Sequence, residues 1–312
     1  MYNEFTLSTI ICSHNEQDFI EESVASLCLD TYVGRELLVV DDASRDNTVP
    51  IVKKLAKQFR NLRFFRFDKN MGPGIARNFA LLQARGKYVH FLDADDTVVA
   101  QELSKAVEIL EQSRAESIRC PHIRILPEVT RVFSSARGEF TGEEAFRQFI
   151  TLRFGSWSAW AAVYKRESLL ESGSRFQQGF LYEDVIFCCN ALYKSGRVIG
   201  HDVPFYVYRC TNPSITRGVE AQGLGHTMGS ARMYYDVCMF FAMLPNSEDY
   251  EKELAFFCEI MAMEHAPRML RSLQGEEFKR SLAAQRELLF YLSIKESVFT
   301  RALTSVLNIS AS

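Results

Sequence analysis

The chain turns from apolar to acidic within one short segment, Tyr88-Val89-His90-Phe91-Leu92-Asp93-Ala94-Asp95-Asp96. Carboxylates this close together repel one another, so a fold retains them where a cation neutralises them or where water reaches them freely. An Asp-x-Asp at the end of a buried strand can hold a hard divalent cation whose other ligands are phosphate oxygens. The alternative is a solvated turn in which Asp95 or Asp96 caps a helix that begins near Ala100.

The sequence around this segment alternates between strand and helix patterns. Strands are predicted over residues 7–12, 36–40, 62–67, 88–92 and 117–126. Helices are predicted over residues 19–28, 48–59, 75–84 and 102–112, the third ended by Gly86 in a left-handed cap. Strands that are apolar throughout, each followed by a helix, indicate an α/β fold with a mainly parallel sheet covered on both faces.

Composition limits the classes of protein to consider. With 312 residues, of which 47% are apolar and 24% charged, the chain can bury a full core and is long for one domain. A formal net charge of −3 gives no electrostatic reason to expect a nucleic acid as partner. The eight cysteines form no CxxC pair, and neither a signal peptide nor a membrane-spanning run is visible. These features predict a cytoplasmic protein with reduced thiols.

Polar residues follow four successive predicted strands. They are Ser13-His14-Asn15-Glu16, Asp41-Asp42-Ala43-Ser44, Asp68-Lys69-Asn70 and Asp93-Ala94-Asp95-Asp96. Because open α/β sheets bind ligands outside the carboxyl ends of their strands, four such ends together predict a site. No G-x-G-x-x-G follows the first strand and no Walker loop is present. A nucleotide would therefore be held by side-chain carboxylates, with a metal on its diphosphate.

Four segments, in this order, resemble the signature blocks of family 2 glycosyltransferases, which have the Rossmann-like GT-A fold. They are residues 8–16, 39–48, 70–78 and 91–96. The resemblance continues through Trp157 and Glu183-Asp184 to Tyr208-Arg209 and covers roughly residues 5–217. It implies a GT-A nucleotide-sugar-binding and catalytic domain over residues 1–217, followed by a C-terminal helical region over residues 218–312.

The resemblance also implies roles for individual residues. The positions implied to bind the nucleotide sugar are Ser13, Glu16, Asp42, Asn70, Arg77 and Asp93. Asp95 stands at the position of the metal ligand, where Mn2+ or Mg2+ would bridge the two phosphates. Asp184 matches the general base that acts on the acceptor hydroxyl, and Glu183 lies beside it on the acceptor side.

Each of these residues also has a purely structural explanation. Asp42 could cap the turn to the next helix, although Ser44 or Asp46 could do the same and leave Asp42 for a ligand. Arg77 falls in the first turn of its predicted helix, where the dipole disfavours a cation, so an anionic partner is expected. Glu183-Asp184 could simply be the acidic first turn of a helix.

Two further positions bear on the acceptor and the metal. Trp157 and Trp160 are the only tryptophans; either could stack on an acceptor sugar or be buried, and Trp157 is the preferred acceptor contact. Related enzymes often carry a histidine two residues after the position of Arg209, where this chain has Thr211. That departure leaves the protein ligands of the metal open.

The C-terminal part has apolar residues at helical spacing over 228–243, 249–271 and 276–292. Residues 288–307 carry Lys295 and Arg301 and could lie on a membrane surface. Packing on the chain's own domain or on a second subunit is the favoured alternative. Peripheral membrane contact and a homo-oligomer through these helices are thus both predicted possibilities.

Together these features predict an inverting, metal-dependent glycosyltransferase. It would move a sugar from a nucleoside diphosphate donor, most simply a UDP-sugar, to a hydroxyl of a glycan or lipid-linked acceptor. Polysaccharide biosynthesis in the cytoplasm or at the inner face of the membrane is the implied setting. A nucleotidyltransferase would need a basic Gly-rich loop near the first strand, which is missing. The alternative from another class is a non-catalytic nucleotide-binding or scaffold subunit of a polysaccharide assembly system, which donor hydrolysis would exclude.

Overall fold

The computed structural model describes residues 5–27, 34–178, 182–210 and 224–264, which fall into two compact units. The first unit holds the described residues up to Cys210 except Tyr182. The second contains helices α8 (Leu224–Met243) and α9 (Glu251–Glu264), joined through the 3-10 helix Ser247–Tyr250. The predicted domain boundary at 217/218 lies outside the described residues and stays a prediction.

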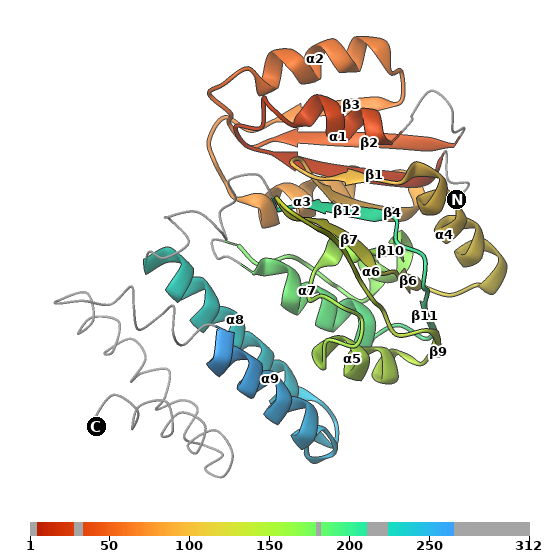
Figure 1. Ribbon diagram of the computed structural model, residues 1–312, viewed down its shortest axis with the longest axis vertical. Helices are drawn as coiled ribbons and strands as arrows, with labels where there is room; N and C mark the ends of the chain where they lie inside the picture. The colour runs from red at the N-terminus through yellow and green to blue at the C-terminus, as the bar shows by residue number, and fades with distance from the viewer. Residues whose placement is uncertain (1–4, 28–33, 179–181, 211–223, 265–312) are drawn as a thin grey trace. The chain divides into compact units, whose positions relative to one another are not determined.

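The first unit is built on an eight-stranded sheet of order β3-β2-β1-β4-β10-β6-β11-β9 (Figure 1). Its strands are β1 (Phe5–Ser13), β2 (Arg35–Asp41), β3 (Leu62–Arg66), β4 (Gly86–Asp93), β6 (Ser117–Arg119), β9 (Gly138–Phe140), β10 (Ala162–Lys165) and β11 (Val198–Gly200). The pairs β3-β2, β2-β1, β1-β4 and β6-β11 are parallel, while β10 and β9 run antiparallel to their neighbours. The predicted mainly parallel sheet is confirmed.

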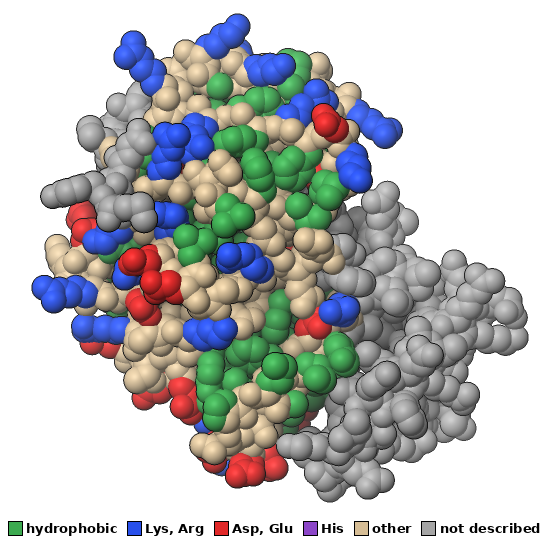
Figure 2. Space-filling view, turned by 180° about the vertical axis from the view of Figure 1, so that it is seen from behind, with side chains coloured by type: hydrophobic (Ala, Val, Ile, Leu, Met, Phe, Trp, Pro, Cys, Tyr) green, Lys and Arg blue, Asp and Glu red, His purple; other side chains and the backbone are tan. Residues whose placement is uncertain are grey.

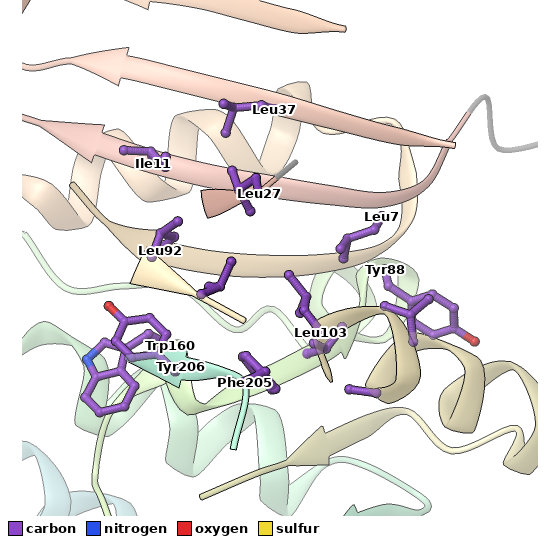
Figure 3. Packing of buried hydrophobic residues seen from close by; sticks show 14 of the residues in the cluster. Leu7, Ile11, Leu27, Leu37, Tyr88, Leu92, Leu103, Trp160, Phe205 and Tyr206 are labelled. Carbon is purple, nitrogen blue, oxygen red and sulfur yellow. The ribbon is translucent and has the colours of Figure 1, made fainter. Parts of the chain in front are cut away.

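Helices cover both faces of this sheet because the strands alternate their apolar side chains between the two faces. On one face, α1 (Ile20–Ser26), α2 (Thr48–Gln58) and α4 (Ala100–Ser113) share a buried cluster with Leu7 and Ile11 of β1 (Figure 3). On the other face lie α3 (Pro73–Gln83) and α7 (Glu183–Tyr193). There the Phe91 ring of β4 meets the Phe187 ring of α7 at 5.6 Å.

The predicted strand over residues 117–126 is wrong as a single element. Its first part is β6 of the large sheet, and its second part is β7 (His122–Ile125) of a separate sheet. Pro121 stands between them and has no N–H for a ladder, while the Cys120 N–H donates to the Ala161 carbonyl at 3.0 Å. The second sheet has the order β5-β12-β7-β8 and adds β5 (Thr97–Val98), β12 (Tyr206–Arg209) and β8 (Thr130–Phe133).

Gly86 has another role than the predicted left-handed helix cap. Helix α3 ends at Gln83, the next residue Ala84 is extended, and Gly86 is the first residue of β4. A Cβ atom at Gly86 would lie 2.5 Å from the Ser8 backbone nitrogen. Glycine is therefore needed because β4 approaches β1 too closely for any side chain.

In the second unit, α8 and α9 pack against each other through the stacked rings of Tyr234 and Phe257, 6.0 Å apart. The predicted helix over 228–243 is confirmed, and that over 249–271 is confirmed as far as Glu264. The predicted helix over 276–292 and the amphipathic segment 288–307 lie outside the described residues. Among the described helices, none combines the length and the apolar character that crossing a membrane requires.

The surface seen from behind carries Lys and Arg side chains dispersed among apolar and uncharged groups (Figure 2). Acidic side chains gather in a few places on the same face. The described residues on this face therefore form no continuous basic strip of the kind that follows a nucleic-acid backbone.

Candidate active site

The strand order creates a topological switch point in the large sheet. Strands β2 and β3 lie on one side of β1, whereas β4, the next strand along the chain, lies on the other. In such sheets ligands bind outside the carboxyl ends of the strands at this switch. The last residues of the central pair, Ser13 and Asp93, therefore lie at the edge where the sequence predicts a site.

The loops that follow β1 and β2 are joined by hydrogen bonds. The Asn15 N–H donates to Ser44 Oγ at 2.9 Å, and Asn15 Oδ1 accepts from the Arg45 N–H at 2.8 Å. One residue on, the Glu16 N–H donates to Thr48 Oγ1 at 2.8 Å. Asn15 has φ 59°, a left-handed conformation that asparagine tolerates better than most residues. The two loops thus form one fixed platform beside the switch point.

Asp42 fixes a third loop to this platform. Its two carboxylate oxygens accept the backbone N–H groups of Met71 and Gly72, both at 2.7 Å, and the residue is only 3% exposed. Asn70 Oδ1 also accepts from the Gly72 N–H, at 3.2 Å. Asp42 is therefore not the cap of the following helix. Each of its oxygens retains a second lone pair that a ligand donor can use.

Two residues at the end of β1 lie beneath these loops. Ser13 is 2% exposed, and its hydroxyl has no hydrogen-bond partner among the described residues. Such an unmade bond is costly in a buried group and suits a site whose ligand supplies the partner. Cys12 pairs in register with Asp93, and burial raises the pKa of its thiol to about 12, an effect that nearby Arg77 opposes.

Arg77 of α3 is the centre of a charge cluster. Its Nη2 donates to Asp93 Oδ1 at 2.8 Å, and its Nη1 donates to Glu183 Oε1 and to Asp184 Oδ1, the latter at 3.3 Å. These partners come from β4 and α7, far apart in sequence. The helix begins at Pro73, so Arg77 lies beyond the first turn where it was predicted. The anionic partner expected for Arg77 is present as protein carboxylates, which raise its pKa further despite burial.

Asp184 is held at both of its oxygens. Oδ1 accepts from Arg77, and Oδ2 accepts from the Ala159 N–H at 3.1 Å. Burial raises the pKa of this carboxyl to about 7, with Glu183 and Asp93 raising it further while Arg77 and Ala159 lower it. An acid with its pKa near neutrality and a fixed orientation has the properties of a general base.

Asp96, one of the two carboxylates that follow β4, has a structural environment of its own. Asp96 is fully buried and accepts from the Tyr206 hydroxyl and the Arg209 N–H, both at 2.7 Å. Its pKa is raised to about 8 by burial and by Asp95 and Asp93. Helix α4 begins at Ala100 without any side-chain cap, so the capping alternative for Asp95 and Asp96 is wrong. Asp96 instead ties the end of β4 to β12.

Asp95 and Glu16 make the remaining acidic corner. The Glu16 pKa is raised to about 8, first by burial and then by the charges of Asp95 and Asp93. Oxygen ligands of this kind fit a hard divalent cation such as Mn2+ or Mg2+. Among the described residues no three His, Cys, Asp or Glu side chains enclose a metal. A cation here would therefore take most of its ligands from phosphate oxygens and water.

The two tryptophans differ in their surroundings. Trp157 is partly exposed, and its indole N–H donates to the Phe149 and Ile150 carbonyls at 3.0 and 3.3 Å. Trp160 is a core residue whose ring stacks on Tyr206 at 4.2 Å, below Leu92 (Figure 3). Of the two, Trp157 is the residue that is partly exposed.

Arg119 is a residue of the site region that the sequence analysis did not single out. It is completely buried in β6, and its Nη2 donates to the carbonyls of Ser156 and Ser158 at 3.2 and 3.0 Å. Its guanidinium lies 5.0 Å from the Phe149 ring centre. Arg119 thus fixes the segment that leads to Ala159, whose N–H binds Asp184. A charged residue inside the strand predicted over residues 117–126 was the available signal.

An eight-stranded, mainly parallel sheet with an acidic edge at its switch point defines the GT-A class of fold, as predicted. The chain belongs to glycosyl transferase family 2, since that family model matches residues 8–171, more than half of its 312 residues.

Individual relatives are distant. The uncharacterized glycosyltransferase YibD of Escherichia coli is 26% identical over 218 residues, 68% of this chain and 63% of the relative. A Campylobacter jejuni protein, GalNAc(5)-diNAcBac-PP-undecaprenol beta-1,3-glucosyltransferase, is 27% identical over 82% of this chain and 81% of its own. The crystal structure of S. aureus TarS 1-349 in complex with UDP-GlcNAc superposes with a TM-score of 0.69 at 21% identity, over 83% of this chain and 73% of that one. The match to YibD thus spans less than two thirds of that relative's length.

Proposed function

We propose that this chain is an inverting glycosyltransferase that moves a sugar from a UDP-sugar to a hydroxyl of a glycan or lipid-linked acceptor. The observation that carries the proposal is Asp184. Its carboxyl has a pKa of about 7, is fixed by Arg77 and the Ala159 N–H, and comes from the same cluster as Asp93 at the switch point.

In the proposed reaction, Asp184 accepts the proton of the acceptor hydroxyl while that oxygen attacks the anomeric carbon. The carbon–oxygen bond to the diphosphate breaks on the opposite face, so the anomeric configuration inverts. A base with a pKa near the working pH is most effective, because a large fraction of it is deprotonated while its affinity for a proton is still high. The two hydrogen bonds to Asp184 hold its carboxylate in place and leave the remaining lone pairs for the acceptor.

The donor is proposed to lie on the platform formed by the loops after β1, β2 and β3. Ser13 offers a buried hydroxyl without a partner among the described residues, and Asp42 offers its remaining lone pairs to the uracil N–H or the ribose. Glu16 and Asn70 border the same loops, and Asp93 is proposed to contact the ribose or the donor sugar. The UDP-GlcNAc bound in the distant structural neighbour supports UDP as the nucleotide.

Asp95 is the proposed metal ligand, for Mn2+ or Mg2+. Bound there, the cation would neutralise the charge that develops on the leaving diphosphate. Asp93 contributes negative potential to this corner, since its charge, after burial and the charge of Asp95, raises the pKa of the neighbouring Glu16. Thr211, the position of the usual histidine, lies outside the described residues.

The acceptor is proposed to approach from the side of Trp157 and Glu183. Glu183 shares Arg77 with the base, and Trp157 is partly exposed. The name of the Campylobacter relative, which includes a PP-undecaprenol acceptor, supports a lipid-linked glycan and a role in polysaccharide assembly at a membrane surface.

A panel of nucleotide sugars with and without Mn2+ tests the proposal. We expect a UDP-sugar to raise the melting temperature, to be hydrolysed slowly without acceptor, and to give a product of inverted configuration by NMR. Binding without any hydrolysis or transfer would favour the non-catalytic scaffold alternative. A panel in which no nucleotide sugar binds would contradict the donor site altogether.

A further inference from the structure

Three side chains form a row across the second sheet. Tyr208 of β12 is the register partner of Arg124 of β7, and Arg124 is in turn the partner of Arg131 of β8. Residues directly opposite each other in neighbouring strands project from the same face of the sheet. The row therefore places two arginine side chains next to each other on one face of the sheet.

Arg124 is held in position by aromatic rings. Its guanidinium carbon lies 4.2 Å from the Phe133 ring centre and 5.3 Å from that of Tyr208. Its Nη2 lies 3.5 Å from His122 Nε2. Burial lowers the pKa of His122 to about 3, so the imidazole is neutral and accepts this bond without adding charge. The cation is thus fixed in place before any ligand arrives.

Among the carboxylates that the structure describes, none neutralises either arginine. Within the described ranges, no ion pair involves Arg124 or Arg131, and Glu128 in the turn between their strands pairs with neither. Like charges directly opposite each other destabilise a strand pair. A bound anion between the two guanidinium groups would remove this repulsion.

The arginine row is linked to the proposed base by packed residues. The Tyr208 ring, on which Arg124 lies, stacks with Trp160 at 5.8 Å. Trp160 directly follows Ala159, whose N–H donates to Asp184 Oδ2. Two packed rings thus join the row to the segment whose backbone fixes Asp184, the segment that also contains Trp157.

We propose that Arg124 and Arg131 bind a phosphate group carried by the acceptor. The assignment deepens the proposed function and rests on it for the identity of the ligand. Arginine suits this role because its planar fork donates two parallel hydrogen bonds to phosphate oxygens. The site would select phosphate-bearing acceptors, such as lipid diphosphates, over neutral sugars.

Calorimetric titration of farnesyl diphosphate into the full chain, with saturating UDP and Mg2+ filling the donor site, tests the assignment. We expect R124Q/R131Q to bind at least about tenfold more weakly than wild type, because two charge-assisted contacts are lost. Arg60→Gln is the matched control, since Arg60 is exposed and lies between α2 and β3, an edge strand of the other sheet. Equal affinity of R124Q/R131Q and wild type would overturn the site.

A second variant guards against misfolding, since Arg124 packs on two rings. Arg131→Glu changes an exposed side chain and replaces a like-charge pair by an opposite-charge pair, so its melting temperature should not fall. It should still lose at least about tenfold in affinity. Wild-type affinity in Arg131→Glu overturns the proposal. Inorganic pyrophosphate that binds as tightly as farnesyl diphosphate, and with the same dependence on Arg131, would show a site for free diphosphate and overturn the acceptor assignment.

The same titrations separate this proposal from the proposed function. UDP affinity should be equal in wild type, R131E and R60Q. Loss of UDP binding in wild type, with farnesyl diphosphate binding still dependent on Arg131, would refute the donor site and leave the phosphate site standing. Normal UDP binding without any binding of farnesyl diphosphate would refute the phosphate site alone.

Discussion

The loops after β1, β2 and β3, proposed to hold the donor (the donor side), and the charge cluster around Arg77, proposed to hold the base (the acceptor side), meet at the same sheet edge. They are held together differently. The loops after β1, β2 and β3 are joined by hydrogen bonds between side chains and backbone amides, such as Asp42 to Met71 and Gly72. The acceptor side depends on ionic contacts to one guanidinium, Arg77, from carboxylates of β4 and α7. The hydrogen bonds fix the conformation of the loops, whereas the ionic contacts set the protonation of the carboxylates around Arg77.

This difference predicts how each side responds to mutation. A platform with many separate hydrogen bonds loses affinity gradually, because each bond contributes only about 0.5–3 kcal/mol. A cluster built around one cation couples its members, so a change at one carboxylate alters the pKa of the others. Substitutions on the two sides should therefore differ in size and in kind.

The largest effect is expected from Asp184→Asn. The amide is nearly isosteric but cannot accept the proton, so transfer should fall by about 10²- to 10⁴-fold. UDP and metal affinity should remain, because their proposed ligands come from the donor side. Steady-state transfer rates and UDP titrations with both proteins measure the two quantities.

Glu183→Gln is the matched control for this substitution. Glu183 also binds Arg77 but is not the proposed base, so its loss of activity should be clearly smaller. Transfer by Asp184→Asn within threefold of wild type would place the base elsewhere. A large fall in the melting temperature of Asp184→Asn would instead indicate that activity is lost because the first turn of α7 is destabilised.

Asp95→Ala tests the proposed metal site in the acidic corner formed by Asp95 and Glu16. Loss of a residue that only supports a metal ligand costs about 10- to 100-fold in metal affinity. Because Asp95 is proposed as a direct ligand, we expect Asp95→Ala to lower the affinity for the metal at least about a hundredfold. The melting temperature should hold, since Asp95 caps no helix. Unchanged stimulation of UDP binding by Mn2+ would show that Asp95 is not a ligand.

Asp42→Ala should weaken UDP about 10- to 100-fold even without metal, because it removes a ligand contact and releases the amides of Met71 and Gly72. Asn70→Ala is the comparison: it removes the weaker bond to Gly72 together with the predicted donor contact of Asn70 and should cost less affinity than Asp42→Ala. If the two variants bind UDP equally well, the Asp42 carboxylate does not hold the nucleotide site together.

The smallest effect concerns pH. With a pKa of about 7, Asp184 is mostly protonated at pH 6 and mostly ionised at pH 8, so the rate should rise about tenfold between them. Glu183→Gln removes a charge that raises this pKa, so its profile should shift to lower pH. A profile that is flat for both proteins would contradict control of protonation by the cluster.

The donor side was largely predictable from the sequence because its information is local. Short apolar runs ending in Asp41-Asp42 or Asp93 identify strands and their carboxyl ends, and parallel pairing then brings those ends together. The acidic residues after β4 were also visible. The hydrogen bonds from the Met71 and Gly72 amides to Asp42 could not be predicted. Every residue except proline has a backbone N–H, so residue types do not show which N–H groups bind a given carboxylate.

The acceptor side was less predictable because its contacts join distant residues. The ion pair of Arg77 with Glu183 spans more than a hundred positions, and a single sequence carries no signal for it. The sequence pattern predicts one strand across Pro121, although the chain passes there from the large sheet to the second sheet. Buried Arg119 was a visible anomaly, but its function became clear only from the carbonyls it binds.

The thiol at the end of β1 has a practical consequence for chemical probes. Cys12 lies next to the charge cluster, yet a pKa of about 12 keeps it protonated at any pH at which the protein would be handled. Thiolates, not thiols, react with alkylating reagents and peroxides. Iodoacetamide should therefore leave this position unlabelled, and electrophilic inhibitors directed at it would gain little from its proximity to the substrate. A fluorophore for following substrate binding would have to be attached at an introduced cysteine, away from the strand end.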